Sequence, residues 1–183
     1  MLGNSELAIP LIFVCTDFLG CNRYSDAGRF AMRKTLANAA GSEEIARRVA
    51  ALTPGSPRQW GTMSVGGMMC HLDDSYQVAL SGRIAASVRV PIPRWMIKYL
   101  ALRTSLPWVK NMKTLPEVQQ GAGGTCPGSF AEDQGRLLDT LMRFSACPTL
   151  AHAQHPFFGA MSKEDWLRWG YLHADHHLRQ FSA

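Results

Sequence analysis

Two histidines near the C-terminus, His173 and His177, have a spacing that suits metal ligands. Residues four apart on a helix lie one turn above each other on the same face, so both imidazoles can reach one ion. A third candidate, His71, lies in an apolar segment, where a buried neutral imidazole needs a polar partner or a metal. A hydrogen-bonded core histidine is the usual explanation of such a position. From the residues alone, both interpretations stay open.

Residues near these histidines suggest supporting roles. Asp74 and Ser75 follow His71 by about one helical turn, on the same side, where they can orient a ligand or a bound water. Asp74, Asp175 and His176 are candidates for proton transfer, although an orienting or surface position is the commoner role for each. No general base or anion-binding group stands out from the sequence.

Capping residues and apolar periodicity predict that the histidines lie on helices. The segment 65–80 is apolar on nearly all sides, which is typical of a buried helix, and Thr62 or Ser64 can cap it. Ser162 and the acidic residues after it predict the start of a last helix over 166–181. On that helix Gly170 shares the histidine face and leaves room for another helix or a ligand. Further helices are predicted over 42–52, 94–103 and 130–147.

The stretch 105–128 breaks this pattern with repeated prolines and glycines, and it predicts one long irregular connection. Connections of this length within compact domains are often functional or mobile. No strand alternation and no internal repeat are apparent. The sequence therefore predicts an all-α fold, a helical bundle with one long connection.

Composition narrows the classes of protein. With 183 residues and 46% hydrophobic content, the chain suits one folded domain. Its net charge of +5 comes from scattered lysines and arginines, so no nucleic-acid partner is expected. No stretch reaches the roughly 18 apolar residues of a membrane helix, so no membrane association is expected either.

Five cysteines occur without a CxxC pair. An odd count without tight spacing argues against a secreted disulfide framework, and a reducing cytoplasm is the expected location. Cys70 adjoins His71, but adjacent helix positions point about 100° apart. Cys70 is therefore interpreted as a core residue, with a thiol near the metal as the alternative.

The N-terminal residues do not follow the predicted helical pattern. The apolar run 7–15 has no preceding Lys or Arg and follows Glu6, so a signal peptide is not expected. Residues 1–31 are interpreted as an extension outside the core. The sequence from Met32 resembles a natural bacterial start, and the predicted domain spans 32–183.

Two segments resemble a known superfamily. The sequence WGTMSVGGMMCHLDD at 60–74 resembles the second-helix signature of the DinB/YfiT-like superfamily, and in particular an uncharacterised bacterial branch that is a domain of unknown function. HPFFG at 155–159, then Trp166, then HADHHLRQF at 173–181 are similar to the ending of that branch. The segments occur in matching order, and the resemblance extends from about Met32 to Phe181.

The resemblance implies an antiparallel four-helix bundle, often a homodimer, with a divalent transition metal (nickel, zinc or iron) at one end of the core. By the resemblance, His71 corresponds to the ligand on the second helix, and His173 and His177 correspond to the closing pair. Three neutral imidazoles leave the ion a charge of +2 and an open position, which is the arrangement of catalytic sites.

Characterised members of the superfamily include transferases and isomerases that use low-molecular-weight thiols such as mycothiol or bacillithiol. The resemblance thus implies a metal-dependent thiol transferase or hydrolase acting on a small-molecule substrate. The alternative is a non-catalytic, stress-related bundle that binds a metal or a small ligand. A nucleic-acid protein is suggested only by the pI and by the superfamily's historical link to DNA damage.

Overall fold

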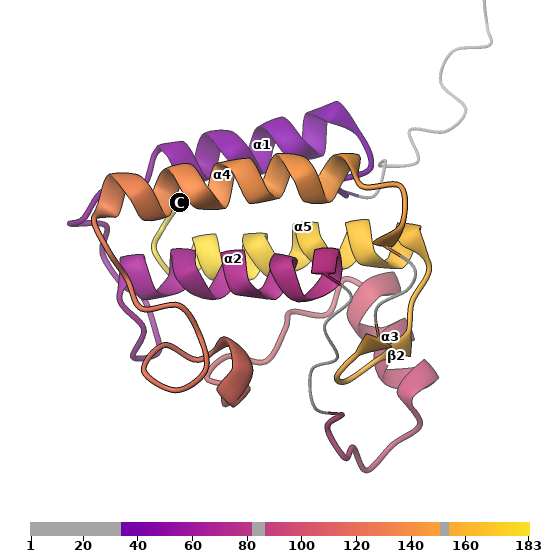
Figure 1. Ribbon diagram of the computed structural model, residues 1–183. Helices are drawn as coiled ribbons and strands as arrows, with labels where there is room; N and C mark the ends of the chain where they lie inside the picture. The colour runs from indigo at the N-terminus through magenta and orange to yellow at the C-terminus, as the bar shows by residue number, and fades with distance from the viewer. Residues whose placement is uncertain (1–33, 82–86, 151–153) are drawn as a thin grey trace, which may run out of the picture. The chain divides into compact units, whose positions relative to one another are not determined.

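A computed structural model describes residues 34–81, 87–150 and 154–183, which all belong to one compact unit. These residues are mostly helical, as predicted (Figure 1). In chain order the elements are α1 (Ala39–Ala50), α2 (Val65–Ser81), α3 (Arg94–Arg103), the 3-10 helix η1 (Pro116–Val118), α4 (Phe130–Ala146), β1 (Gln154–His155), β2 (Gly159–Ala160) and α5 (Lys163–Arg179). The predicted extension at residues 1–31 lies outside the described residues.

Local capping explains where the helices begin. Ser64 is the cap of α2, because its Oγ accepts the N–H of Gly67 at 3.0 Å. The predicted start of α1 at residue 42 is wrong, because Asn38 accepts the N–H of Gly41 and the helix begins at Ala39. Helix α5 likewise begins before residue 166, since Ser162 and Asp165 form a reciprocal capping box.

A short antiparallel ribbon, β1 and β2, precedes α5 and was not expected from the sequence. Each strand has two residues, which is too short for apolar alternation to be visible. His155 organises the turn, because its Nδ1 accepts the backbone N–H groups of Phe157 and Phe158 at 3.2 and 3.3 Å. Gly159 follows with a φ of 71°, a left-handed conformation that favours glycine.

Helices α1, α2, α4 and α5 pack around the core, where α4 and α5 each contact both α1 and α2 (Figure 1). Helices α1 and α4 run antiparallel, since Gln134 near the start of α4 donates to Val49 near the end of α1. Helices α2 and α5 also run antiparallel, since His71 meets His173 and Tyr76 meets Gly170.

In contrast, α2 and α4 run in the same direction, since Asp73 pairs with Arg136 and Gln77 with Thr140. Helices α1 and α5 also run in the same direction. The connection 105–128 allows the parallel pairing of α2 with α4, because it ends beside the start of α2, where Pro127 lies next to Gly66.

Gly170 on α5 is a point of close packing in the core. Tyr76 on α2 is buried, and its hydroxyl donates to the carbonyl oxygen of Gly170 on α5 at 2.8 Å. A Cβ at Gly170 would lie 2.7 Å from Cε1 of Phe144 and 2.9 Å from Cδ1 of Leu36. The room predicted at this position is therefore filled by side chains from outside α5. No helix among the described residues is long and apolar enough to cross a membrane.

We expect Gly170→Ala to lower the free energy of unfolding by about 1–3 kcal/mol, because the added methyl group overpacks the core. Gly135→Ala on α4 is the matched control, since a methyl group there meets no described atom within 4 Å. The control should raise stability by about 0.5–1 kcal/mol through helix propensity alone. Urea denaturation of both variants measures the difference. Equal effects of the two changes would contradict the close packing at Gly170.

Candidate metal centre

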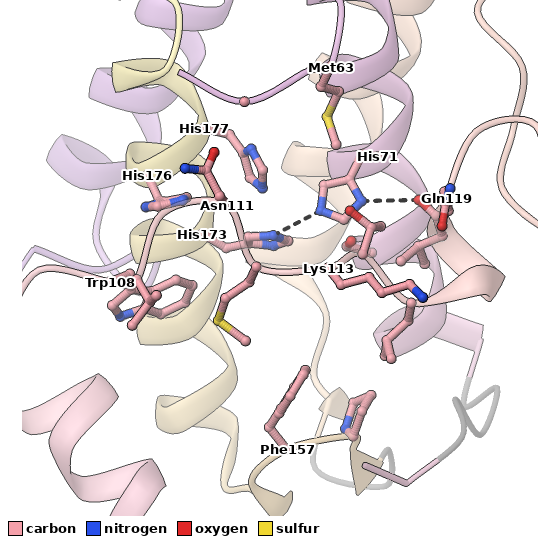
Figure 2. Close-up of a pocket in the computed structure, with 18 of the residues that line it drawn as sticks. Met63, His71, Trp108, Asn111, Lys113, Gln119, Phe157, His173, His176 and His177 are labelled. Carbon is pink, nitrogen blue, oxygen red and sulfur yellow. Dashed lines mark hydrogen bonds between the residues drawn. The ribbon is translucent and has the colours of Figure 1, made fainter. Parts of the chain in front are cut away.

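The structure brings His71 on α2 together with His173 and His177 on α5 (Figure 2). One ring nitrogen from each histidine lies within 4.8 Å of the others. The Nε2 atoms of His71 and His173 are 3.2 Å apart. Two nitrogens that bind one tetrahedral ion at about 2.0–2.1 Å stand roughly 3.3 Å from each other. The three histidines can therefore hold a metal ion, and within the described residues no cysteine or carboxylate joins the group.

His71 is oriented by the long connection. Its Nδ1 lies 3.1 Å from the carbonyl oxygen of Val118, the last residue of η1. A carbonyl only accepts, so Nδ1 carries the proton and the lone pair of Nε2 faces the site. Hydrogen bonds of this kind fix the ring and the tautomer of metal-binding histidines. Val118 contributes through its backbone, which the sequence could not indicate.

The segment that presents Val118 is fastened to α2. The backbone N–H and the hydroxyl of Thr125 each donate to a carboxylate oxygen of Asp74 at 2.7 Å. Gly123 and Gly124 fold tightly beneath η1, where a Cβ would lie within 2.9 Å of backbone atoms. Asp74 thus supports His71 through the connection, and its carboxylate accepts hydrogen bonds from Thr125.

His177 is oriented by Gln180, one turn further along the chain. The Nε2 of Gln180 donates to the carbonyl oxygen of Trp60 at 2.8 Å, which turns its Oε1 toward Nδ1 of His177 at 3.1 Å. The Nδ1 of His177 must then carry the proton, and its Nε2 keeps a lone pair that can bind a metal ion. Gly61 permits this approach, because a Cβ there would lie 2.6 Å from the Gln180 amide nitrogen.

His173 differs from the other two histidines. Its Nδ1 is buried and has no hydrogen-bond partner among the described residues. Its ring lies against Trp169, with centroids 4.8 Å apart, and near Trp108 at 6.1 Å. Packing against aromatic rings, together with the 3.2 Å contact to Nε2 of His71, therefore orients His173, whereas groups outside the triad accept hydrogen bonds from His71 and His177.

Burial keeps the three imidazoles neutral. It lowers the pKa of His71 and lowers that of His173 strongly, and the neighbouring histidines add to the effect on His173. Burial, with the proximity of His71, lowers the pKa of His177 to about 3. At pH 7 all three rings therefore offer lone pairs, and protons compete little with a metal ion.

The triad lines a cavity of about 1040 Å³ between α2, α5, α3 and the connection 105–128. Aromatic and aliphatic side chains dominate its wall, and polar groups such as Asn111, Lys113 and Gln119 lie near the histidines (Figure 2). The volume is at the upper end of the range of small-molecule sites. The connection 105–128 thus supplies much of the lining of this cavity.

The candidates for proton transfer occupy different places. Asp175 pairs with Arg48 at 2.7 Å and with Arg179 at 3.0 Å, and it does not line the cavity. His176 and Ser75 do line the cavity, and His176 faces it between Trp60 and Trp108.

Cys70 is buried, as predicted, and its sulfur accepts from Arg136 at 3.3 Å. Burial raises the pKa of its thiol to about 11, so Cys70 remains a protonated core residue.

The fold and the site together define a mostly helical protein in which a three-histidine cluster lines a large cavity. The family model described as "Protein of unknown function (DUF1569)" matches residues 31–183, and the chain therefore belongs to this family. No curated protein and no solved structure matches the chain. The family match names no wider superfamily.

We expect Gln180→Ala to weaken zinc binding by about 10- to 100-fold, because His177 loses the group that fixes its tautomer. Gln134→Ala is a matched control. Gln134 on α4 also donates to a backbone carbonyl, that of Val49 on α1, away from the histidines. Competitive titration with a chromogenic chelator measures both affinities. If the two variants bind zinc equally well, Gln180 has no role in ordering the site.

Proposed function

We propose that this protein is a DinB/YfiT-like four-helix bundle whose metal site acts on a small molecule, by thiol transfer or hydrolysis. The two sequence segments that resemble the superfamily support the proposal, since they contribute the three clustered histidines. The packing of α1, α2, α4 and α5 around one core is compatible with such a bundle. By the same resemblance we propose a homodimer and a low-molecular-weight thiol as one partner.

The observation that carries the proposal is that all three histidines line the cavity. A structural zinc is normally closed by four protein ligands, whereas a catalytic metal keeps a position for an exogenous ligand. With three imidazoles as the candidate ligands, an ion here would have an open side toward the cavity. A molecule in the cavity can reach that side without rearrangement of the helices.

The residues of the chain have separate tasks in this proposal. When bound, a divalent ion supplies Lewis acidity, which lowers the pKa of a coordinated water or thiol. His71, His173 and His177 would hold it, while Val118 and Gln180 keep two of the rings in the binding tautomer. The apolar wall lowers the local dielectric constant, which would strengthen the electrostatic attraction between the ion and an anionic donor.

The open site makes a spectroscopic prediction. With cobalt in place of the native ion, addition of a thiol should produce a sulfur-to-cobalt charge-transfer band, and azide should shift the ligand-field spectrum. The band should weaken as pH falls, first because the thiol becomes protonated and then, below the usual pKa range of histidine, because the imidazoles do. Absorption spectroscopy of the full chain tests this, with the double variant His173→Ala/His177→Ala as the control that should show neither change.

A cobalt spectrum that responds to neither additive would mean that the coordination is closed. The enzyme proposal would then be withdrawn in favour of the alternative, a non-catalytic metal-binding protein. Binding without any turnover of thiol or ester substrates would favour a ligand-binding, stress-related role.

A further inference from the structure

The cavity extends well beyond the candidate metal ligands. On α5, Trp169 and Trp166 precede His173 by one and two turns, and both line the cavity. At 1.5 Å per residue, Trp166 and His173 are separated by roughly 10 Å along the helix. A ligand with one end at the triad therefore has room for a body of about that length.

The wall along this length is aromatic. The cavity is lined by Trp60, Trp108, Phe157, Phe158, Trp166 and Trp169. Trp108 and Trp169 both lie near the ring of His173, tilted by 31° and 36° to it. Phe157 lies on the side of the triad toward the strands β1 and β2 (Figure 2). Aromatic side chains that line a cavity can stack with an aromatic ligand, face to edge or offset.

The mouth of the cavity is also apolar. Five large hydrophobic side chains both line the cavity and are exposed to solvent, namely Ile92, Leu100, Leu106, Val109 and Met112. They belong to α3 and its flanking segments. Exposed apolar groups gathered at one place mark binding surfaces more often than ordinary protein surface. Among the residues that line the cavity, Lys113 and Glu117 are the charged side chains other than histidine.

We propose that the site takes an elongated, aromatic small molecule that carries a single metal-binding donor at one end. The donor would lie at the triad, and the rings would lie along α5 between Trp108 and Phe157. This inference rests on the metal-dependent function proposed above, and it names the substrate class of that site. A small polar donor has no surface to place against the six aromatic residues of the wall, so it binds weakly.

Matched carboxylates test the proposal on the zinc-loaded full chain. Biphenyl-4-carboxylate has rings and a donor, and acetate has the same donor without rings. By calorimetry we expect biphenyl-4-carboxylate to bind at least about 100-fold more tightly than acetate, since two rings bury a large apolar area. The His71→Ala variant should lose most of this affinity, because the carboxylate loses the ion.

Two variants of the cavity wall and one control test where the rings of the ligand lie. Trp108→Ala and Phe157→Ala should each weaken biphenyl-4-carboxylate binding by about fivefold or more. Trp95→Ala is the matched control, because Trp95 is 68% exposed on α3 and does not line the cavity. Its affinity should equal that of the wild type. If one of the two cavity variants does not fold, the other still tests the proposal.

The possible failures are distinguishable. Equal affinities for acetate and biphenyl-4-carboxylate in a protein that holds zinc would overturn the aromatic substrate class and leave the metal function intact. Unchanged binding of biphenyl-4-carboxylate in His71→Ala would also overturn the proposal, because the donor would not lie at the triad. Absence of zinc binding in the wild type would instead contradict the proposed function itself.

Discussion

The burial of three neutral imidazoles against one another is the constraint on which the site depends. Each ring places one nitrogen in the same small space, where these atoms lie within 4.8 Å of one another, and a desolvated lone pair there is costly unless a partner satisfies it. Burial lowers the pKa of all three, so the rings do not relieve this cost by taking up protons near pH 7. A divalent cation satisfies all three lone pairs at once, and the 3.2 Å separation of two Nε2 atoms suits that role.

The rest of the structure keeps these rings in place. Gly170 lets α5 pack closely against Phe144 and Leu36, and the hydroxyl of Tyr76 ties α2 to α5 at the same level. The connection 105–128 then closes over the open side of the two helices. It orients His71 through a backbone carbonyl and supplies Trp108 to the wall of the cavity. One irregular segment thus positions a candidate ligand and forms a large part of the pocket.

The sequence predicted much of this arrangement, for reasons that can be named. The i and i+4 spacing of His173 and His177 requires only a helix, and the apolar residues around His71 require only burial. Local patterns were therefore sufficient to identify these three residues as candidate ligands. Their convergence needed the tertiary contact between α2 and α5, which the resemblance implied and local periodicity did not. Two supporting residues were not predicted. Val118 left no signal in the sequence because it acts through its main chain. Gln180 did leave a signal, since it lies three residues after His177 within the matched C-terminal segment. The same-direction pairing of α2 with α4 depends on the path of the connection, which no helical pattern encodes.

The most direct test of the account is zinc titration of the metal-free full chain by calorimetry, beside His71→Ala and His176→Ala. His176 lines the same cavity but lies outside the cluster of candidate ligands, so its variant is the matched control. The account predicts about one zinc ion per chain for the wild type and for His176→Ala, with an affinity at least about 100-fold weaker in His71→Ala. Equal stoichiometry and affinity in the wild type and His71→Ala would contradict the three-histidine metal centre.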